Sequence, residues 1–581
     1  MRGFLAIASR HPIDPVMAFA VLSEARSCGL SIVLRTDRVL VAASGLAKCV
    51  LARDSGVILG DIYHRHGPAG AFDGSAREVE MLTKICHDDG LGERCWGSFL
   101  AIVDTPSRDA PRVHHSPFSS LGAFVAEKDR TILVASDARL LARAAGRPAS
   151  IDWSTVASQL ARDDLSLRST CLDKIRELRC GEMLELPADA LGVFTRTWDP
   201  WCHAHADRAV LDRGEALELL ERELIRCGDA CLHGLGPSIL DLSGGLDSSL
   251  LAALCARGRG EVQAVNMFSA ATEGDERGYA REVAAHLGMA LAEQTPDATC
   301  VDILRCARPD LPRPYVRSFV QETDRLTMAA TPGALAFLNG TGGDAVFCHL
   351  QSSGPAVDVL RTPGAGQGFL HTVREVAEAA RCSVWTGLRK SLVKAARRHK
   401  RVPLQPERTF LMRGIGETIP DEELPWPAPP REILPGKLDH VRGLYLSSFN
   451  LNAFGRADSL RSIYPLMSQP LIEACLRIPT WHWIGRGYNR LPAREIASHW
   501  LPPNVAWRVS KGGLGQLQRD IFRLNRLRIR EILLDGQLQG QGLLDRRSLE
   551  KALEPDSSLL VGTFSRVLRL VDFEAWAKTW T

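Results

Sequence analysis

The feature that most constrains the fold is a short apolar run that passes through two glycines into an Ala-rich segment. Residues 239–242 predict a buried strand, which Ser243-Gly244-Gly245 interrupts. We expect residues 247–249 to cap the helix that follows. A strand, a glycine turn and a helix N-terminus present several backbone N–H groups to one anion. Because a Cβ at these glycines would hold a phosphate away, the stretch predicts a phosphate-binding turn.

No Gly-Lys-Ser or Gly-Lys-Thr string follows, so the turn is not of the Walker type. The string Ser-Gly-Gly-Leu-Asp-Ser-Ser at 243–249 instead resembles the pyrophosphate-binding loop of ATP pyrophosphatases, which cleave ATP to AMP and pyrophosphate. An ordinary glycine-rich turn is the alternative. Apolar runs at 262–268 and 289–292 flank a helix expected at 276–287. This alternation predicts a doubly wound parallel sheet with helices, in which ligands sit at the carboxyl ends of the strands.

Length and composition narrow the class of protein. A chain of 581 residues exceeds one domain, and 45% hydrophobic and 24% charged residues are globular values. A net charge of +3 gives no sign of a nucleic-acid or membrane partner. The first apolar run is too short for a signal peptide and none is long enough to span a membrane, so we expect a cytoplasmic protein. The cysteines form no CxxC pair and are predicted to be reduced, and the Cys and His residues at 202–233 match no common zinc spacing.

Residues 1–205 are predicted to form an antiparallel, layered β domain. Short apolar runs recur there between turn residues, with helical patterns between them. The expected strands are 4–8, 31–34, 39–43, 57–59, 99–103, 123–126 and 131–135, and the expected helices are 15–27, 76–87 and 138–145.

Two strings in this part, at 92–104 and 131–141, resemble the amidotransferase (Ntn-type) half of asparagine synthetase. In that family, a cysteine exposed as the mature N-terminus attacks glutamine and releases ammonia. This sequence has Arg2 and Gly3 there, and its first cysteine is Cys28. Without a terminal thiol the nucleophile is missing. We therefore expect residues 1–205 to be an inactive glutaminase-like domain, and residues 206–581 to be the ATP-pyrophosphatase-type synthetase domain.

A second apolar run, at 334–338, also leads into glycines and an aspartate: Gly342, Gly343 and Asp344. It resembles the second signature of the asparagine synthetase family. Asp247 and Asp344 would then lie at the ends of two strands of one sheet. Because Mg²⁺ prefers one or two carboxylates with phosphate oxygens and water, we expect both to hold Mg²⁺ on ATP. A turn residue beside glycines is the alternative for Asp344.

This sequence departs from the family at the residues that handle the amine. Thr341 stands where the family usually has Glu or Tyr, and β-lactam synthetases use a Tyr there as part of a base dyad. Ala345 replaces a frequent Glu. Threonine is no general base near neutral pH. An α-amino group has a pKa of about 7.7–8.0, so a substrate that attacks through a peptide N-terminus needs little help from a base.

Strings at 461–479, 489–497 and 501–513 resemble the C-terminal signature of the family in the form found in lasso peptide cyclases. Lys511 matches the family lysine that contacts the α-phosphate and the developing charge, and Arg508 is expected to assist it. Surface charge is the alternative for both. The basic helical segment at 381–401 is either a solvated face or a contact for an acidic partner. Residues 403–435 predict an extended loop or lid.

The resemblance implies an AMP-forming, amide-forming ligase. Its nucleotide contacts would be Leu242, Ser243, Gly244, Gly245, Asp247, Ser248, Asn266, Met267, Gly342 and Gly343. The favoured substrate is a ribosomally made precursor peptide: its side-chain Asp or Glu is adenylated and its N-terminal amine closes a macrolactam. A leader-binding protein and a leader peptidase would be partners. A β-lactam synthetase, a glutamine-independent asparagine synthetase-like ligase and a non-catalytic scaffold are the alternatives.

Overall fold

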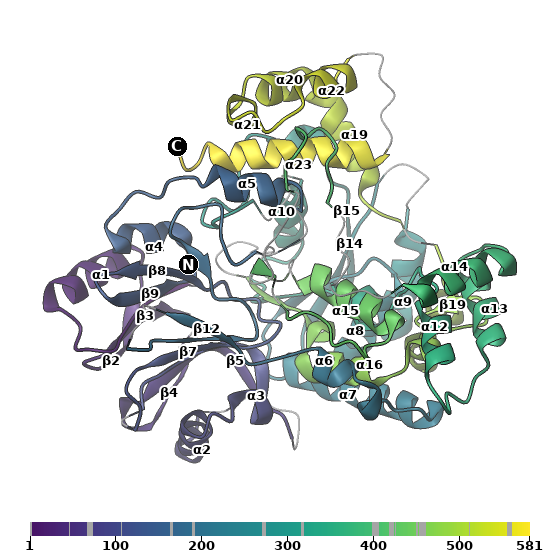
Figure 1. The fold of residues 1–581 in the computed structure, drawn as a ribbon, viewed down its shortest axis with the longest axis horizontal. Coiled ribbons are helices and arrows are strands. Elements are labelled where there is room, and N and C mark those ends of the chain that lie inside the picture. The colour runs from purple at the N-terminus through teal and green to yellow at the C-terminus, as the bar shows by residue number, and fades with distance from the viewer. Residues whose placement is uncertain are drawn as a thin grey trace.

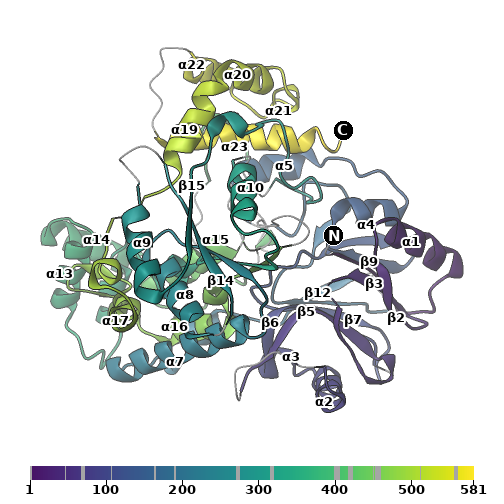
Figure 2. The ribbon, with the colours of Figure 1, turned by 180° about the vertical axis from the view of Figure 1, so that it is seen from behind.

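The structure is a computed structural model with the predicted fold class: antiparallel sheets form the N-terminal part, and one parallel sheet with helices follows (Figure 1). It describes residues 3–581 except 46, 67–71, 73, 106, 163–164, 166, 189–191, 259, 270–274, 315–318, 398–405, 417–422, 425, 449–450, 452–459, 511 and 555–560. Figure 2 shows the two parts side by side, with helices α13 (Phe369–Ala379) and α14 (Val384–Ala396) far from the antiparallel sheets.

Two six-stranded antiparallel sheets stack face to face in the N-terminal part. Alternate side chains along each strand point inward, so Phe4 and Ala6 of β1 share a buried cluster with Val57 and Leu59 of β5. The intervening Leu5 packs outward against helices. The result is the layered arrangement that the spacing of apolar runs predicted.

In sheet order, the first sheet holds β10 (Arg176–Glu177), β8 (Phe124–Lys128), β9 (Thr131–Ala135), β1 (Gly3–Ser9), β3 (Val39–Ser44) and β2 (Ser31–Arg35). The second holds β12 (Val193–Arg196), β11 (Glu182–Glu185), β7 (Arg112–His115), β6 (Cys95–Val103), β5 (Gly56–His64) and β4 (Ala47–Val50). The helices of this part are α1 (Pro15–Ser27), α2 (Ala76–His87), α3 (Leu91–Arg94), α4 (Ala138–Ala145), α5 (Trp153–Leu160) and α6 (Trp201–Ala204).

The parallel sheet has the strand order β15–β14–β13–β16–β17. The chain adds β14 and β15 on one side of β13, then returns to add β16 and β17 on the other, so the order reverses between β13 and β16. Open α/β sheets bind ligands at such a reversal, outside the carboxyl ends of the strands. Leu240 of β13 lies beside Leu338 of β16, so the segments that follow both strands emerge together. The strands are β13 (Ser238–Asp241), β14 (Val262–Met267), β15 (Leu291–Gln294), β16 (Ala336–Leu338) and β17 (Arg461–Ile463).

Helices surround this sheet, and all of those below except α10 and α12 contribute to the core that it forms. They are α7 (Arg213–Leu232), α8 (Leu246–Arg257), α9 (Arg277–Leu287), α10 (Val320–Ala330), α11 (Gly343–Val346), α12 (Gly354–Arg361), α15 (Pro435–Ser448), α16 (Gln469–Arg477), α17 (Leu491–Trp500) and α18 (Pro503–Ala506). None of the helices in the described residues is both long and apolar enough to cross a membrane.

The C-terminal helices pack against the N-terminal part. Val156 of α5 shares a buried cluster with Ile521 of α19 and Val571 of α23, and Figure 1 shows α23 lying across α5. The predicted boundary near residue 205 stays a prediction. These helices are α19 (Gly515–Leu524), α20 (Arg526–Leu534), α21 (Gln537–Gly540), α22 (Arg546–Ala552) and α23 (Val561–Ala577).

Helices α1, α2 and α4 have the predicted bounds, but two predictions around the central motif were wrong. Residues 247–249 do not cap α8: Gly245 is the N-cap, no side chain caps the helix, and Asp247 faces an arginine instead. The third strand starts at Leu291 rather than 289, because Gly288 is left-handed and the Met289 N–H closes the end of α9.

Candidate active site

Two carboxylates meet where the order of the parallel strands reverses. Asp247 lies in the first turn of α8, soon after β13, and Asp344 lies in α11, soon after β16. Nη1 of Arg490 is 3.0 and 3.2 Å from the two carboxylate oxygens of Asp247 and 2.6 Å from Oδ1 of Asp344. One nitrogen atom thus bridges the two side chains that the sequence singled out. Their proposed role in holding a metal stays a prediction.

The second glycine loop (residues 340–343) packs directly on the first turn of α8. A Cβ on Gly343 would lie 2.4 Å from Cγ of Asp247, and one on Gly340 would lie 3.0 Å from the Ser248 nitrogen. Gly342 has a φ of +88° and lies against Sδ of Met467. Glycine is therefore required here for the close approach of two loops and for a left-handed turn.

The first glycine loop (residues 243–245) uses its glycines differently from the prediction. Gly244 has a φ of +72°, and a Cβ there would lie 2.6 Å from Cβ of Tyr279 and 2.7 Å from the Ala280 nitrogen. It is a glycine because α9 packs against it. A Cβ on Gly245 would meet only Oγ of Ser243, at 3.4 Å. Of the two, only Gly245 has room for a Cβ.

Arg508 is held beside the first glycine loop, and its predicted role in assisting Lys511 stays a prediction. Its Nη1 donates to the Gly244 carbonyl at 3.1 Å, and its Nη2 donates to Glu276 at 2.6 Å. Its guanidinium also lies 3.9 Å from the ring centroid of Tyr279. Glu276 accepts a second bond, from the Gly512 N–H at 2.8 Å. Lys511, the predicted α-phosphate contact, lies outside the described residues.

The other predicted nucleotide contacts surround the base of the first loop. Asn266 is fully buried and donates from Nδ2 to the Leu242 carbonyl at 2.8 Å, while its Oδ1 has no partner among the described residues. The Ser243 and Ser248 hydroxyls lie 3.1 Å apart, and Met267 is half-buried. Asn266 thus supports the loop backbone, and its contact with a nucleotide stays a prediction.

Thr341 takes part in a small polar network below the second loop. Its hydroxyl donates to Oδ1 of Asn339, whose Nδ2 donates to Asp241 at 3.1 Å. A second polar contact reaches Asp344 from His349, whose Nδ1 lies 3.3 Å from its Oδ1. The position that holds a base in β-lactam synthetases therefore helps to fix this loop.

Sequence reasoning assigned no role to Arg490, Arg494 or Glu276. Arg494 is buried and fixes the segment before Arg508, since Nη1 donates to the Ala506 and Arg508 carbonyls, both at 2.8 Å. Burial, followed by the nearby Arg490 charge, lowers the pKa of Arg494 to about 10. Both arginines stand in the 489–497 string, so their spacing of four residues at the start of a helix was the available signal.

The two carboxylates suit a divalent cation in number and chemistry, because Mg²⁺ takes one or two carboxylates and completes its shell with phosphate and water oxygens. In this structure, however, Nη1 of Arg490 lies between them. Among the described residues, no group of three or more His, Cys, Asp or Glu side chains gathers as a metal site. A cation bridging Asp247 and Asp344 therefore fits only when Arg490 moves.

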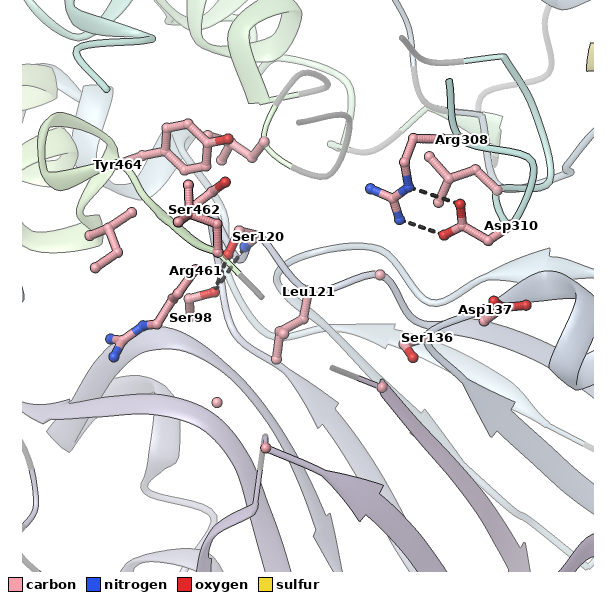
Figure 3. Close-up of a pocket in the computed structure, with 18 of the residues that line it drawn as sticks. Ser98, Ser120, Leu121, Ser136, Asp137, Arg308, Asp310, Arg461, Ser462 and Tyr464 are labelled. Carbon is pink, nitrogen blue, oxygen red and sulfur yellow. Dashed lines mark hydrogen bonds and ion pairs between the residues drawn. The ribbon is translucent and has the colours of Figure 1, made fainter. Parts of the chain in front are cut away.

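A cavity of about 1180 Å³ lies between the N-terminal sheets and the edge strand β17 (Figure 3). Figure 3 shows hydroxyl groups in its lining and the ion pair of Arg308 with Asp310, whose closest atoms are 2.5 Å apart. Arg461, also in the lining, pairs with Asp61. Met467 lines the cavity and lies against Gly342, so one side chain separates the cavity from the second glycine loop. No local pattern in the sequence indicates this cavity.

Comparison with known proteins identifies one family. The family model described as asparagine synthase matches residues 219–580. No curated protein matches the chain. Among solved structures, one described as the allosteric regulatory enzyme of purine biosynthesis is 10% identical over 50% of this chain and 80% of its own, with a TM-score of 0.22. The glutamine phosphoribosylpyrophosphate amidotransferase from B. subtilis is 10% identical over 52% and 83%, with a TM-score of 0.22.

Proposed function

Because the chain belongs to the asparagine synthase family, we propose that it is an ATP-dependent ligase that joins a carboxylate to an amine through an acyl-adenylate. The observation that carries the proposal is the meeting of two glycine loops, with Asp247 and Asp344, at the reversal of the parallel sheet. In this reaction a carboxylate oxygen attacks the α-phosphorus of ATP and pyrophosphate leaves. The amine nitrogen then attacks the acyl carbon, AMP leaves, and the amine proton passes to solvent.

The backbone and the charges at the first glycine loop suit the first step. The first turn of α8 has no side-chain cap, so its N–H groups and the positive end of the helix are available to the leaving pyrophosphate. Arg508, fixed by Glu276, places a guanidinium beside the same loop. Lys511 would meet the α-phosphate, as the family resemblance implies. Preorganised cations at the point where charge develops stabilise the transition state.

A magnesium ion on the nucleotide would neutralise the charge of the departing pyrophosphate. Asp247 and Asp344 would hold it. Both carboxylates remain partly accessible: their side chains are 17% and 39% exposed. Such positions are typical of metal ligands that reach a bound nucleotide rather than of a closed protein cage.

The substrate that we propose is a peptide whose Asp or Glu side chain is adenylated and whose N-terminal amine closes a macrolactam. The cavity of about 1180 Å³ exceeds the roughly 300–1,000 Å³ typical of small-molecule sites. Its lining includes Met467, which lies against Gly342 of the second glycine loop. With a pKa of about 7.7–8.0, a sizeable fraction of an α-amine is already neutral near physiological pH, so a base at Thr341 is dispensable. A leader-binding protein and a leader peptidase would supply this peptide.

The proposal is tested with the full chain, ATP, Mg²⁺ and linear peptides that carry a free N-terminus and one internal acid. We expect AMP and pyrophosphate to form, with a peptide product lighter by one water. A peptide with Asn or Gln in place of the acid should give no AMP. An N-acetylated peptide should support pyrophosphate exchange but no ring.

Asp247→Asn is the control variant for this test, and Asp297→Asn, an exposed carboxylate elsewhere in the same part, is its match. If wild type and Asp247→Asn release pyrophosphate equally, the protein is a non-catalytic scaffold. Amidation of free aspartate or of a small amino acid, in place of the peptide, would identify an asparagine synthetase-like or β-lactam-forming ligase instead.

A further inference from the structure

Arg490 occupies the position that a cation bridging the two site carboxylates would take. A single nitrogen, Nη1, lies within 3.2 Å of three carboxylate oxygens, two from Asp247 and one from Asp344. The Arg490 side chain is 12% exposed. Its Nε is buried and has no partner among the described residues, so part of the guanidinium is left unsatisfied in this position. The Arg490 guanidinium is thus well paired at Nη1 and, within the described part of the chain, unpaired at Nε.

The backbone that carries Arg490 is fixed. Arg490 is the N-cap of α17 with a φ of +56°, a left-handed conformation that an arginine rarely adopts. Arg494, one turn later, donates from Nε to the Asn489 carbonyl at 2.9 Å and also holds Ala506 and Arg508. Because the backbone is fixed and the side chain is long, the guanidinium can change partner while the helix stays in place.

We propose that Arg490 is a built-in counter-ion that keeps the dicarboxylate closed to divalent cations until nucleotide binds, and that it then turns from the carboxylates to the phosphates. Without nucleotide, a cation would have to enter beside a guanidinium at hydrogen-bond distance, where repulsion is strong. The phosphates offer Arg490 a stronger, bidentate partner. Binding of metal and of nucleotide is therefore coupled, and each strengthens the other. The phosphate half of this inference rests on the proposed function, whereas the exclusion of cations does not.

The test measures binding of Mn²⁺, a spectroscopic substitute for Mg²⁺, to the full chain without nucleotide. We expect weak binding to wild type and binding about tenfold tighter to Arg490→Met, which removes the charge but keeps the side-chain stem. Arg490→Lys should resemble wild type, because it restores a cation. The control Arg281→Met, whose arginine pairs with Glu293 at the surface, should not change the affinity.

A second variant locates the new site: Asp247→Asn added to Arg490→Met should return Mn²⁺ binding to the wild-type level. A non-hydrolysable ATP analogue should tighten Mn²⁺ binding to wild type far more than to Arg490→Met. If Arg490→Met fails to fold, Arg490→Gln replaces it. Equal Mn²⁺ affinity of wild type and variant without nucleotide would overturn the inference. Failure to bind ATP would contradict the proposed function. The difference in Mn²⁺ affinity between wild type and Arg490→Met without nucleotide would still be measurable.

Discussion

The cavity beside the N-terminal sheets and the reversal point of the parallel sheet both gather polar side chains, but they balance charge in different ways. In the cavity lining, Arg308 pairs with Asp310, and Ser98 pairs with Ser120 at 3.0 Å. At the reversal point, two carboxylates share one nitrogen of Arg490. Side chains that satisfy one another suit recognition of a polar substrate. Charges that are incompletely balanced are able to exchange partners, which is what chemistry on a phosphate requires.

The largest expected effect is the loss of stability when a buried ion pair is broken, compared with the loss for an exposed pair. The side chains of Arg508 and Glu276 are 5% and 11% exposed, and they pair at 2.6 Å. Arg508→Met leaves Glu276 buried without its counter-charge, so we expect the free energy of unfolding to fall by about 3–5 kcal/mol. Urea denaturation measures this loss. Adding Glu276→Gln should restore part of it.

The matched variant in the N-terminal part is Arg10→Met, which breaks a pair with Asp109, an 86% exposed side chain, at 3.0 Å. We expect that change to alter the free energy of unfolding by less than about 1 kcal/mol. Equal losses for Arg508→Met and Arg10→Met would show that the pair beside the first glycine loop is solvated, contrary to the structure.

The next largest effect is a difference in stability between alanine variants of the two glycines in the first loop. Gly244→Ala combines a left-handed φ with a Cβ 2.6 Å from Tyr279, so it should lower the free energy of unfolding by about 2 kcal/mol. Gly245→Ala has room for its Cβ and a φ of −80°, so it should unfold like wild type. Because Gly245 is the N-cap of α8, at the proposed pyrophosphate site, its variant should still weaken ATP binding. Calorimetry and thermal melting measure the two quantities separately, and loss of stability in Gly245→Ala would contradict the assignment.

The two glycine loops could be found from the sequence because each signal is local. An apolar strand followed by glycines and an aspartate is read within a dozen residues, and the carboxyl ends of parallel strands must share one edge of the sheet. This reasoning predicted, from the sequence alone, that Asp247 and Asp344 lie close together. It misjudged Gly244, because nothing near that residue in the chain reveals that α9 packs against it.

Arg490 was missed for a related reason. It lies 243 residues beyond Asp247, and only the folded chain brings the two side chains together. The same holds for Arg508 and Glu276, which are separated by 232 residues. Resemblance placed Arg508 in the site, but its partner could not be inferred without the packing of α9. Long-range ion pairs and the cavity depend on how the two parts of the molecule meet, and no local pattern encodes that.

A third variant tests whether the cavity receives the substrate. Leu121 lines it, and Figure 3 shows its side chain among the polar residues. Leu121→Trp fills part of the space, so the KM for the peptide should rise about tenfold while the KM for ATP stays unchanged. Leu370→Trp, on an exposed residue of α13, is the control. An increase in the KM for ATP instead would mean that the cavity serves the nucleotide site.

The smallest expected effect concerns pH and compares two buried histidines. Burial lowers the pKa of His440 to about 3 and that of His114 to about 4. Each histidine takes up a proton more readily when unfolded, so stability is lost as pH falls from the unfolded pKa of about 6.5 toward the folded value. Between pH 7.5 and 5.5, His440→Gln and His114→Gln should each remove about 1 kcal/mol of this acid sensitivity.

The two histidines should differ in how their protonation affects ATP binding. Nε2 of His440 donates to the Val346 carbonyl at 3.1 Å, two residues after Asp344, whereas His114 lies in the N-terminal β7. Protonation of His440 therefore places a buried positive charge against the segment that carries Asp344. We expect His440→Gln to reduce the weakening of ATP binding between pH 7.5 and 5.5, and His114→Gln to leave it unchanged. Identical binding profiles for the two variants would show that acid acts on the fold as a whole, with no separate route through α11.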